Sequence, residues 1–211
     1  MSSFLTIAVL GFMGVRLVSG LRVSRSTGGR ALAAEIVRGV RWRHVWPVAV
    51  VLPAVITAAG LIMLIPGMSW GWWTMLGGEG NPVFGSSDAT RGTALEWIIP
   101  LCFMALLLPA LPLFAHAEER MFRAGAEHWS TGRRIAKTLQ FGMVHALIGI
   151  PVGAALALSL GGAYFMAVYL RGWRATWSRH AATIESTRAH TVYNAVIVAI
   201  VATLAVLVAV A

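Results

Sequence analysis

The sequence predicts an all-α membrane protein, a polytopic integral helix bundle of about six transmembrane helices. Hydrophobic residues fill 58% of the 211 positions and charged residues only 12%, a composition that excludes an ordinary soluble domain. The apolar residues are gathered in long runs separated by short basic blocks. No stretch alternates long enough for a barrel, and no internal repeat is visible, so we expect one membrane domain covering residues 1–211.

The first two apolar runs predict two spans. They cover about residues 4–21 and 45–65, and tryptophans near the second run are placed as interfacial anchors. Between the runs, residues 22–44 carry six arginines, and an Ala-rich middle at 31–40 predicts a short surface helix. Residues 66–93 are rich in glycine, with serine, proline and asparagine, which predicts a loop exposed on the opposite side.

Four further spans follow. A third run covers about residues 95–117. The apolar stretch 135–170 is too long for one span, since roughly 20 residues suffice. The segment Gly-Ile-Pro-Val-Gly at 149–153 is the natural break, and it predicts two helices, 135–150 and 152–170. The last run covers about residues 190–210.

The distribution of positive charge predicts the topology. Three blocks, residues 22–44, 118–137 and 171–188, hold 15 of the 17 Lys and Arg residues. Alternation of six spans puts all three blocks on one side, which the positive-inside rule makes cytoplasmic, and both termini then face outward. The net charge of +9 thus indicates membrane loops and no nucleic-acid partner. We expect a multi-pass protein of a cell membrane, and the dominance of arginine over lysine suggests a bacterial source.

Two adjacent carboxylates close the third run. Glu118 and Glu119 lie where charge is costly, at the edge of the hydrocarbon layer. Glu119 and Arg123 are four residues apart, so they share one helix face and can pair. Glu118 points elsewhere and is left free. Taken alone, the acidic pair also fits the solvated end of a helix.

Two more polar pairs lie near the same edge of their spans. Phe141 and His145 are four residues apart, and so are His190 and Asn194. We expect the three elements to meet around a cavity open to the cytosol. Each also has a simpler interpretation: His145 as a core histidine, His190 as an interfacial one, and Asn194 as a helix-packing residue.

In this order, the three motifs resemble the signature of the CPBP intramembrane proteases, the CaaX prenyl protease and bacteriocin-processing group, also called Abi. The group is related to the Ras-converting CaaX endopeptidase. The resemblance covers about residues 95–211; residues 1–94 add two spans, a basic cytoplasmic loop and an extracytoplasmic loop. One departure is a basic insert at 171–188, longer than the tight turn expected between the second and third motifs.

The resemblance implies a role for each motif residue. Glu118 would be the general base that activates water, and His145 would hold the same water. His190 and Asn194 would donate hydrogen bonds to the developing oxyanion. The supporting residues would be Glu119, Arg123 and Phe141.

Metal dependence is open for such a site. Glu118, His145 and His190 could supply three ligands to a divalent metal such as zinc, leaving a position for water. The sequence has no His-Glu-x-x-His motif, and we favour activation of water without a metal.

The expected function is therefore an intramembrane endopeptidase that acts on a membrane-associated peptide or protein, with the lipid bilayer as its other partner. Two alternatives stay open: a non-catalytic scaffold or binding subunit of the same fold, and a small proton or metal transporter subunit. Outside the motifs, we expect His44, His128 and His180 to be solvated and His116 to be interfacial.

Overall fold

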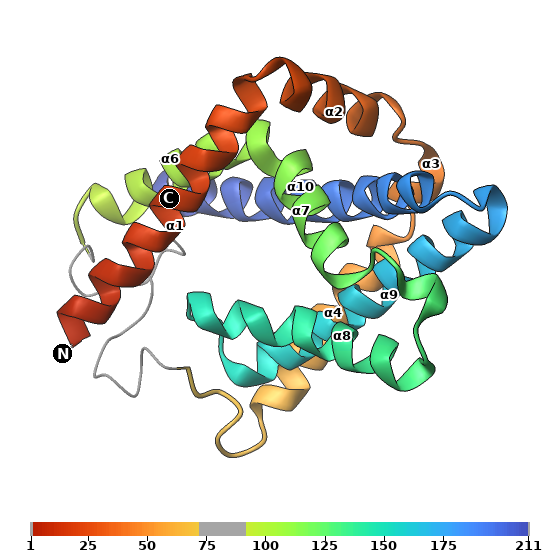
Figure 1. Cartoon of the computed structure of the whole chain (residues 1–211). Coiled ribbons are helices and arrows are strands. Elements are labelled where there is room, and N and C mark those ends of the chain that lie inside the picture. The colour runs from red at the N-terminus through yellow and green to blue at the C-terminus, as the bar shows by residue number, and fades with distance from the viewer. Residues whose placement is uncertain (1, 72–91, 211) are drawn as a thin grey trace.

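The computed structural model describes residues 2–71 and 92–210, and every element in these ranges is helical (Figure 1). The predicted loop at 66–93 therefore falls largely outside the described residues. The α-helices are α1 (Ser2–Arg25), α2 (Thr27–Arg38), α3 (Trp42–Val45), α4 (Val48–Met63), α6 (Leu95–Leu107), α7 (Leu111–Phe122), α8 (Thr131–Met143), α9 (Val152–Thr176) and α10 (Arg179–Val210). Three 3-10 helices join them: η2 (Leu108–Ala110), η3 (Ala126–His128) and η4 (Val144–Ile148).

Four helical segments in the described part of the chain are long and apolar enough to cross a membrane. They are Trp42–Met63, Leu95–His128, Val152–Thr176 and Arg179–Leu204. Large apolar side chains are exposed along α4 and the second half of α10, as lipid-facing helices require; examples are Val50, Ile56, Leu204 and Leu207. The all-helical fold is thus confirmed, and the four apolar segments fit a membrane bundle, while the number six stays a prediction.

Helix α9 is the centre of the bundle, because α8, α4 and α10 all pack against it (Figure 1). Its buried positions are mostly small, and small residues let helices in a membrane approach closely. The small buried residues are Gly153, Ala155, Ala157, Ser159, Gly161, Gly162 and Gly172. On α8, Gly142 faces this surface so closely that a methyl group there would collide with the Ser159 side chain and the Ala155 carbonyl.

Substitution of Gly142 by Ala is expected to destabilise the protein by about 1–3 kcal/mol, because α8 must move away from the backbone of α9. Gly132, on the same helix, is the matched control, since nothing lies within 4 Å of a methyl group there. Thermal unfolding in detergent compares the two variants. Equal midpoints for Gly142→Ala and Gly132→Ala would contradict this close helix contact.

The predicted break in the apolar stretch 135–170 is confirmed. Gly149 has φ 99°, in the left-handed region that favours glycine, and α9 begins directly after Pro151. The expected helix 135–150 is shorter than predicted as an α-helix. It begins at Thr131, with Ser130 accepting a hydrogen bond from the Arg133 amide at 3.3 Å, and becomes the 3-10 turn η4 from Val144.

The third apolar run is bent at its prolines. Pro109 lies in η2 and Pro112 in the first turn of α7, so α6 and α7 are separate helices. Helix α7 continues to Phe122, beyond the apolar run. Glu118 and Glu119 therefore lie inside a helix and face its neighbours.

The expected long insert at 171–188 is wrong. Helix α9 continues to Thr176 and α10 begins at Arg179, so only Trp177 and Ser178 connect them. Trp177 has φ 52° and ends α9 with a tight turn. Residues 179–188 are the first turns of α10, because nothing in them interrupts a helix.

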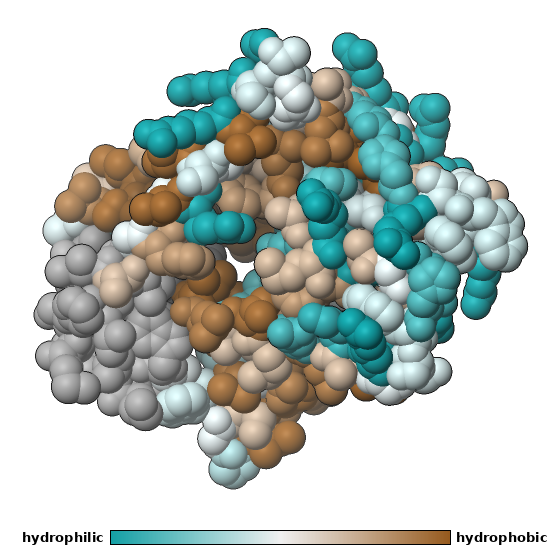
Figure 2. Space-filling view, viewed as in Figure 1, coloured by the Kyte–Doolittle hydropathy of each residue, from teal (hydrophilic) through white to brown (hydrophobic). Residues whose placement is uncertain are grey.

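Hydrophilic residues gather along the side of the molecule that carries α2, α3 and the α9–α10 connection, and apolar residues cover much of the rest of the coloured surface in the view of Figure 2. Helix α2 is the predicted surface helix; the Ser26 side chain caps it by accepting a hydrogen bond from the Gly29 amide at 3.0 Å. One prediction for this side is wrong: His44 is fully buried, because α3 packs against α10.

Candidate functional site

Glu119 is the centre of a buried polar network between α7 and α10. Its side chain is completely buried. One carboxylate oxygen, Oε1, accepts from Arg123 Nη1 at 2.6 Å and lies 2.8 Å from His190 Nδ1. The other oxygen accepts a short hydrogen bond from the Ser186 hydroxyl. A buried charge needs such partners to offset the loss of water, so Glu119 is held in one position.

Arg123 is as deeply buried as its partner. Beside the bond to Glu119, its guanidinium lies over the Phe141 ring at 4.3 Å and near the Phe165 ring at 5.3 Å. A guanidinium is attracted to the face of an aromatic ring, which offsets part of its desolvation. Arg123 thus ties the end of α7 to α8 and α9. The predicted Glu119–Arg123 pair is confirmed.

His190 is fixed on two sides. Its ring stacks on Phe165, with centroids 4.3 Å apart, and meets the edge of Phe141 at 5.6 Å. Since a carboxylate only accepts, the contact between Nδ1 and Glu119 places a proton on Nδ1. The second nitrogen, Nε2, faces Glu118, with 3.7 Å between it and Oε2.

Glu118 is the less constrained of the two acids. Its side chain is 36% exposed, and its Oε2 atom is buried without a hydrogen-bond partner among residues 2–71 and 92–210. The 3.7 Å to His190 is longer than a direct hydrogen bond. An inward-facing carboxylate oxygen is therefore left open beside an imidazole nitrogen. The prediction that pairing of Glu119 leaves Glu118 unpaired agrees with this geometry.

His145 joins the cluster through Phe141. The two rings are 5.2 Å apart, and His145 Nδ1 lies 2.8 Å from the Phe141 carbonyl oxygen, which can only accept. Nδ1 is therefore the donor, and Nε2 is left without a partner in the described part of the chain. His145 is the second residue of the 3-10 turn η4, which follows directly on the end of α8.

Asn194 lies one helical turn after His190 on α10 and is half-buried. Among the described residues, no hydrogen bond holds its amide. The remaining predicted site residues are in continuous contact around the Phe141 ring: Glu118, Glu119, Arg123, Phe141, His145 and His190.

Two members of the network were not predicted. Ser186 bonds to Glu119, and Phe165 stacks on His190. Ser186 had a detectable signal, because Ser186, His190 and Asn194 recur at intervals of four and so form one polar stripe along α10. Phe165 had none, since an aromatic residue in an apolar run is ordinary packing.

The metal candidates do not form a ligand set. The described residues contain no group of three or more His, Cys, Asp or Glu side chains placed to hold a metal ion. Glu118 and His190 approach each other, while the Nδ1 atom of His145 is used by a backbone carbonyl.

Comparisons with known proteins add no relative. No protein-family model, curated protein or solved structure matches the chain. The resemblance to CPBP proteases therefore rests on the motif residues themselves.

Proposed function

We propose that this protein is an intramembrane endopeptidase of the CPBP type, in which Glu118 activates the attacking water. The observation that carries the proposal is the open Oε2 atom of Glu118, buried and unpartnered, 3.7 Å from His190 Nε2. A partly enclosed acid beside a histidine held by a second, buried acid is an arrangement suited to proton transfer. If Glu118 and Glu119 were only the solvated end of a helix, neither would need a buried histidine as a neighbour.

The reaction follows from these positions. A water beside Glu118 donates one proton to the carboxylate as its oxygen attacks the carbonyl carbon of the substrate peptide. The carbonyl becomes an oxyanion, which the Asn194 amide stabilises by donating a hydrogen bond. When the tetrahedral intermediate collapses, the C–N bond breaks, and Glu118 returns the proton to the leaving amine nitrogen.

Glu119 acts as a positioning residue through His190. Because the Nδ1 proton points at Glu119, the Nε2 atom is directed to the reacting region. Nε2 can donate to an oxyanion only when the ring carries its second proton. The Asn194 amide donates whatever the protonation state of the ring, so it is the constant member of the oxyanion site.

The substrate we propose is a membrane-associated peptide or protein that enters from the cytosolic leaflet. Two features support this: Glu118, His190 and Asn194 lie on helical segments apolar enough to span a bilayer, and the basic blocks of the chain cluster toward the same ends of these segments. The cell membrane and its lipids are then the second partner.

Replacement of Asn194 by Ala is expected to lower kcat for peptide cleavage by about 10²–10³-fold with little change in KM, since the lost bond forms mainly in the transition state. Thr203→Ala is the matched control on the same helix, because Thr203 is exposed and bonds only to the Ala199 carbonyl. Equal activity in the two variants would show that Asn194 does not take part in catalysis.

The metal alternative is tested on the wild-type protein. Cleavage of a pool of membrane peptides by purified protein is expected to persist after dialysis against a strong chelator, because Glu118 acts as the base without a Lewis acid. Loss of activity with the chelator, restored by added zinc, would instead assign Glu118 and His190 to a metal site.

A further inference from the structure

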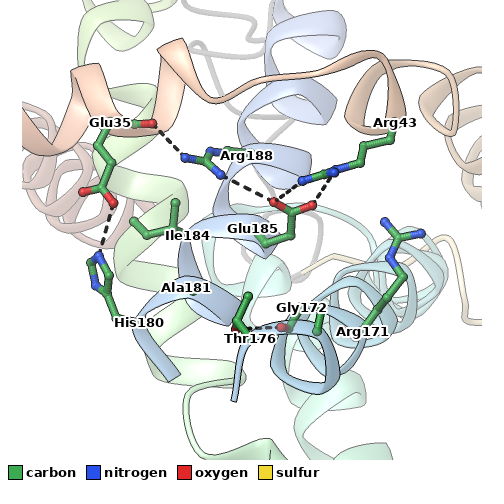
Figure 3. Close-up of a pocket in the computed structure, with 11 residues that line it drawn as sticks. Glu35, Arg43, Arg171, Gly172, Thr176, His180, Ala181, Ile184, Glu185 and Arg188 are labelled. Atoms are coloured by element: carbon green, nitrogen blue, oxygen red, sulfur yellow. Dashed lines mark hydrogen bonds and ion pairs between the residues drawn. The ribbon is translucent and has the colours of Figure 1, made fainter. Parts of the chain in front are cut away.

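A cavity of about 510 Å³ lies at the basic end of the bundle, and none of the motif residues lines it (Figure 3). Its walls come from α2, α3, α9 and α10. The charged and titratable side chains around it are Glu35, Arg43, Arg171, His180, Glu185 and Arg188. A volume of this size is typical of a small-molecule or headgroup site.

Glu185 is shared by several cations. Arg43 makes two bonds to it, at 2.8 and 3.2 Å, and Arg188 approaches at 3.5 Å. His44 Nε2 is a further 3.0 Å contact, although the two atoms are not aligned as a hydrogen bond. One carboxylate balances one positive charge, so two arginines around Glu185 leave an excess of positive charge.

Arg188 has donor capacity that the chain leaves unused. Its Nη2 atom donates to the Glu35 backbone carbonyl at 3.1 Å, and the guanidinium lies so close over Gly39 that a methyl group there would collide with it. Its Nε atom is buried and has no acceptor among the described residues. A buried donor without an acceptor is rare, so part of the positive charge of Arg188 is not offset by a hydrogen bond within the described residues.

Arg171 is a cation of the cavity for which the described part of the chain supplies no ion-pair partner. Its side chain is exposed and extends toward Arg43 from the opposite wall, with no ion pair drawn to it in Figure 3. The only other acid of the cavity, Glu35, lies 3.2 Å from His180. An anion placed between Arg43 and Arg171 would therefore meet two guanidinium groups and no free carboxylate.

Tryptophans place this cavity at the level of lipid headgroups. Trp42 and Trp46, at the start of one candidate span, are 73% and 52% exposed, and Trp177, just after the end of another, is 75% exposed. Exposed tryptophans at span ends are typical of the membrane–water interface. The cavity lies between these ends, because Arg43 and Arg171 belong to the same two helical segments.

We propose that this cavity binds the phosphate group of an anionic phospholipid, held between Arg43 and Arg171, with Arg188 completing the positive wall. Guanidinium groups match a phosphate by paired, charge-assisted hydrogen bonds, and basic pockets between membrane helices are suited to anionic headgroups. The site does not depend on the proposed hydrolysis, since it shares no residue with it.

The test is a thermal-shift titration of the full-length protein in neutral detergent. The probes are short-chain phosphatidylglycerol, short-chain phosphatidylcholine, glycerol 3-phosphate and inorganic phosphate. Phosphatidylglycerol is expected to raise Tm saturably and phosphatidylcholine much less. In Arg171→Gln, the half-saturating phosphatidylglycerol concentration is expected to rise about tenfold, the effect of losing one charge-assisted bond.

Arg174→Gln is the matched control, because Arg174 is exposed one turn further along α9 and lies outside the cavity. Its titration is expected to match the wild type. Equal weakening in both variants would overturn the proposal in favour of general surface charge. If glycerol 3-phosphate or inorganic phosphate saturates the shift at the same concentration as the lipid, the proposal that the bound phosphate belongs to a phospholipid is wrong. Arg171 is exposed and unpaired, so its replacement leaves the fold intact, which circular dichroism checks.

Discussion

Replacement of Glu118 by Gln is expected to lower peptide cleavage by about 10³-fold while the protein stays folded. The amide has nearly the same shape as the carboxylate but takes no proton from water. Because Glu118 is 36% exposed and makes no hydrogen bond through its buried oxygen, its replacement removes little stabilising interaction. The measurement is the initial rate on a pool of membrane peptides, together with the thermal unfolding midpoint of the same sample.

The control for this experiment is Glu96→Gln, which removes a carboxylate from the far end of the same candidate span, where it accepts from the Gly92 amide at 2.8 Å. This variant is expected to cleave at the wild-type rate. If wild type, Glu118→Gln and Glu96→Gln are all equally inactive on every peptide tested, the hydrolytic proposal fails. A non-catalytic scaffold or binding subunit then becomes the function to test.

Replacement of Arg123 by Met is expected to destabilise the protein by about 3–5 kcal/mol, the largest stability effect predicted here. Arg123 is 1% exposed, and its loss leaves the fully buried Glu119 without the partner that balances its charge. The Phe141 and Phe165 rings also lose the cation between them. Chemical or thermal unfolding in detergent measures the change.

The double variant Glu119→Gln with Arg123→Met separates the charge from the packing. It removes both charges at once, so it is expected to be clearly more stable than Arg123→Met alone, because a neutral amide can keep its bond to Ser186. The single variant Glu119→Gln completes the comparison. If the stability loss of the double variant equals the sum of the losses of the two single variants, the two side chains are not coupled, contrary to their 2.6 Å contact. The double variant is expected to cleave more slowly than the wild type, since His190 loses the carboxylate that fixes its orientation.

Features that depend on residues close in the sequence could be predicted from the sequence. The break before Pro151 follows from glycine and proline chemistry, and the Glu119–Arg123 pair follows from helical spacing. The meeting of Glu118 with His190 was expected because both residues lie near the same edge of their spans, and the resemblance to a known family gave the same pairing; no spacing rule alone reaches across the 72 positions between them.

The features that the sequence did not predict depend on how the helices pack together. The resemblance implied only a supporting role for Glu119, whereas this residue is the buried centre that joins α7 to α10 through Ser186 and His190. Ser186 was missed because it lies in a stretch expected to be an insert between spans. The charge of that stretch indicated a loop, but the same residues form the last turns of α9 and the first turns of α10.

The central position of α9 has a consequence for biosynthesis. Helix α4 packs mainly on α9, yet it leaves the ribosome roughly a hundred residues earlier, which at roughly 5–20 residues per second means several seconds. During that interval α4 enters the bilayer without its neighbour, and the lipid itself must solvate the face that later meets α9. The contact between α4 and α9 can therefore form only after residues 152–176 have been made, so a chain that stops before residue 152 leaves the α9-facing side of α4 in lipid.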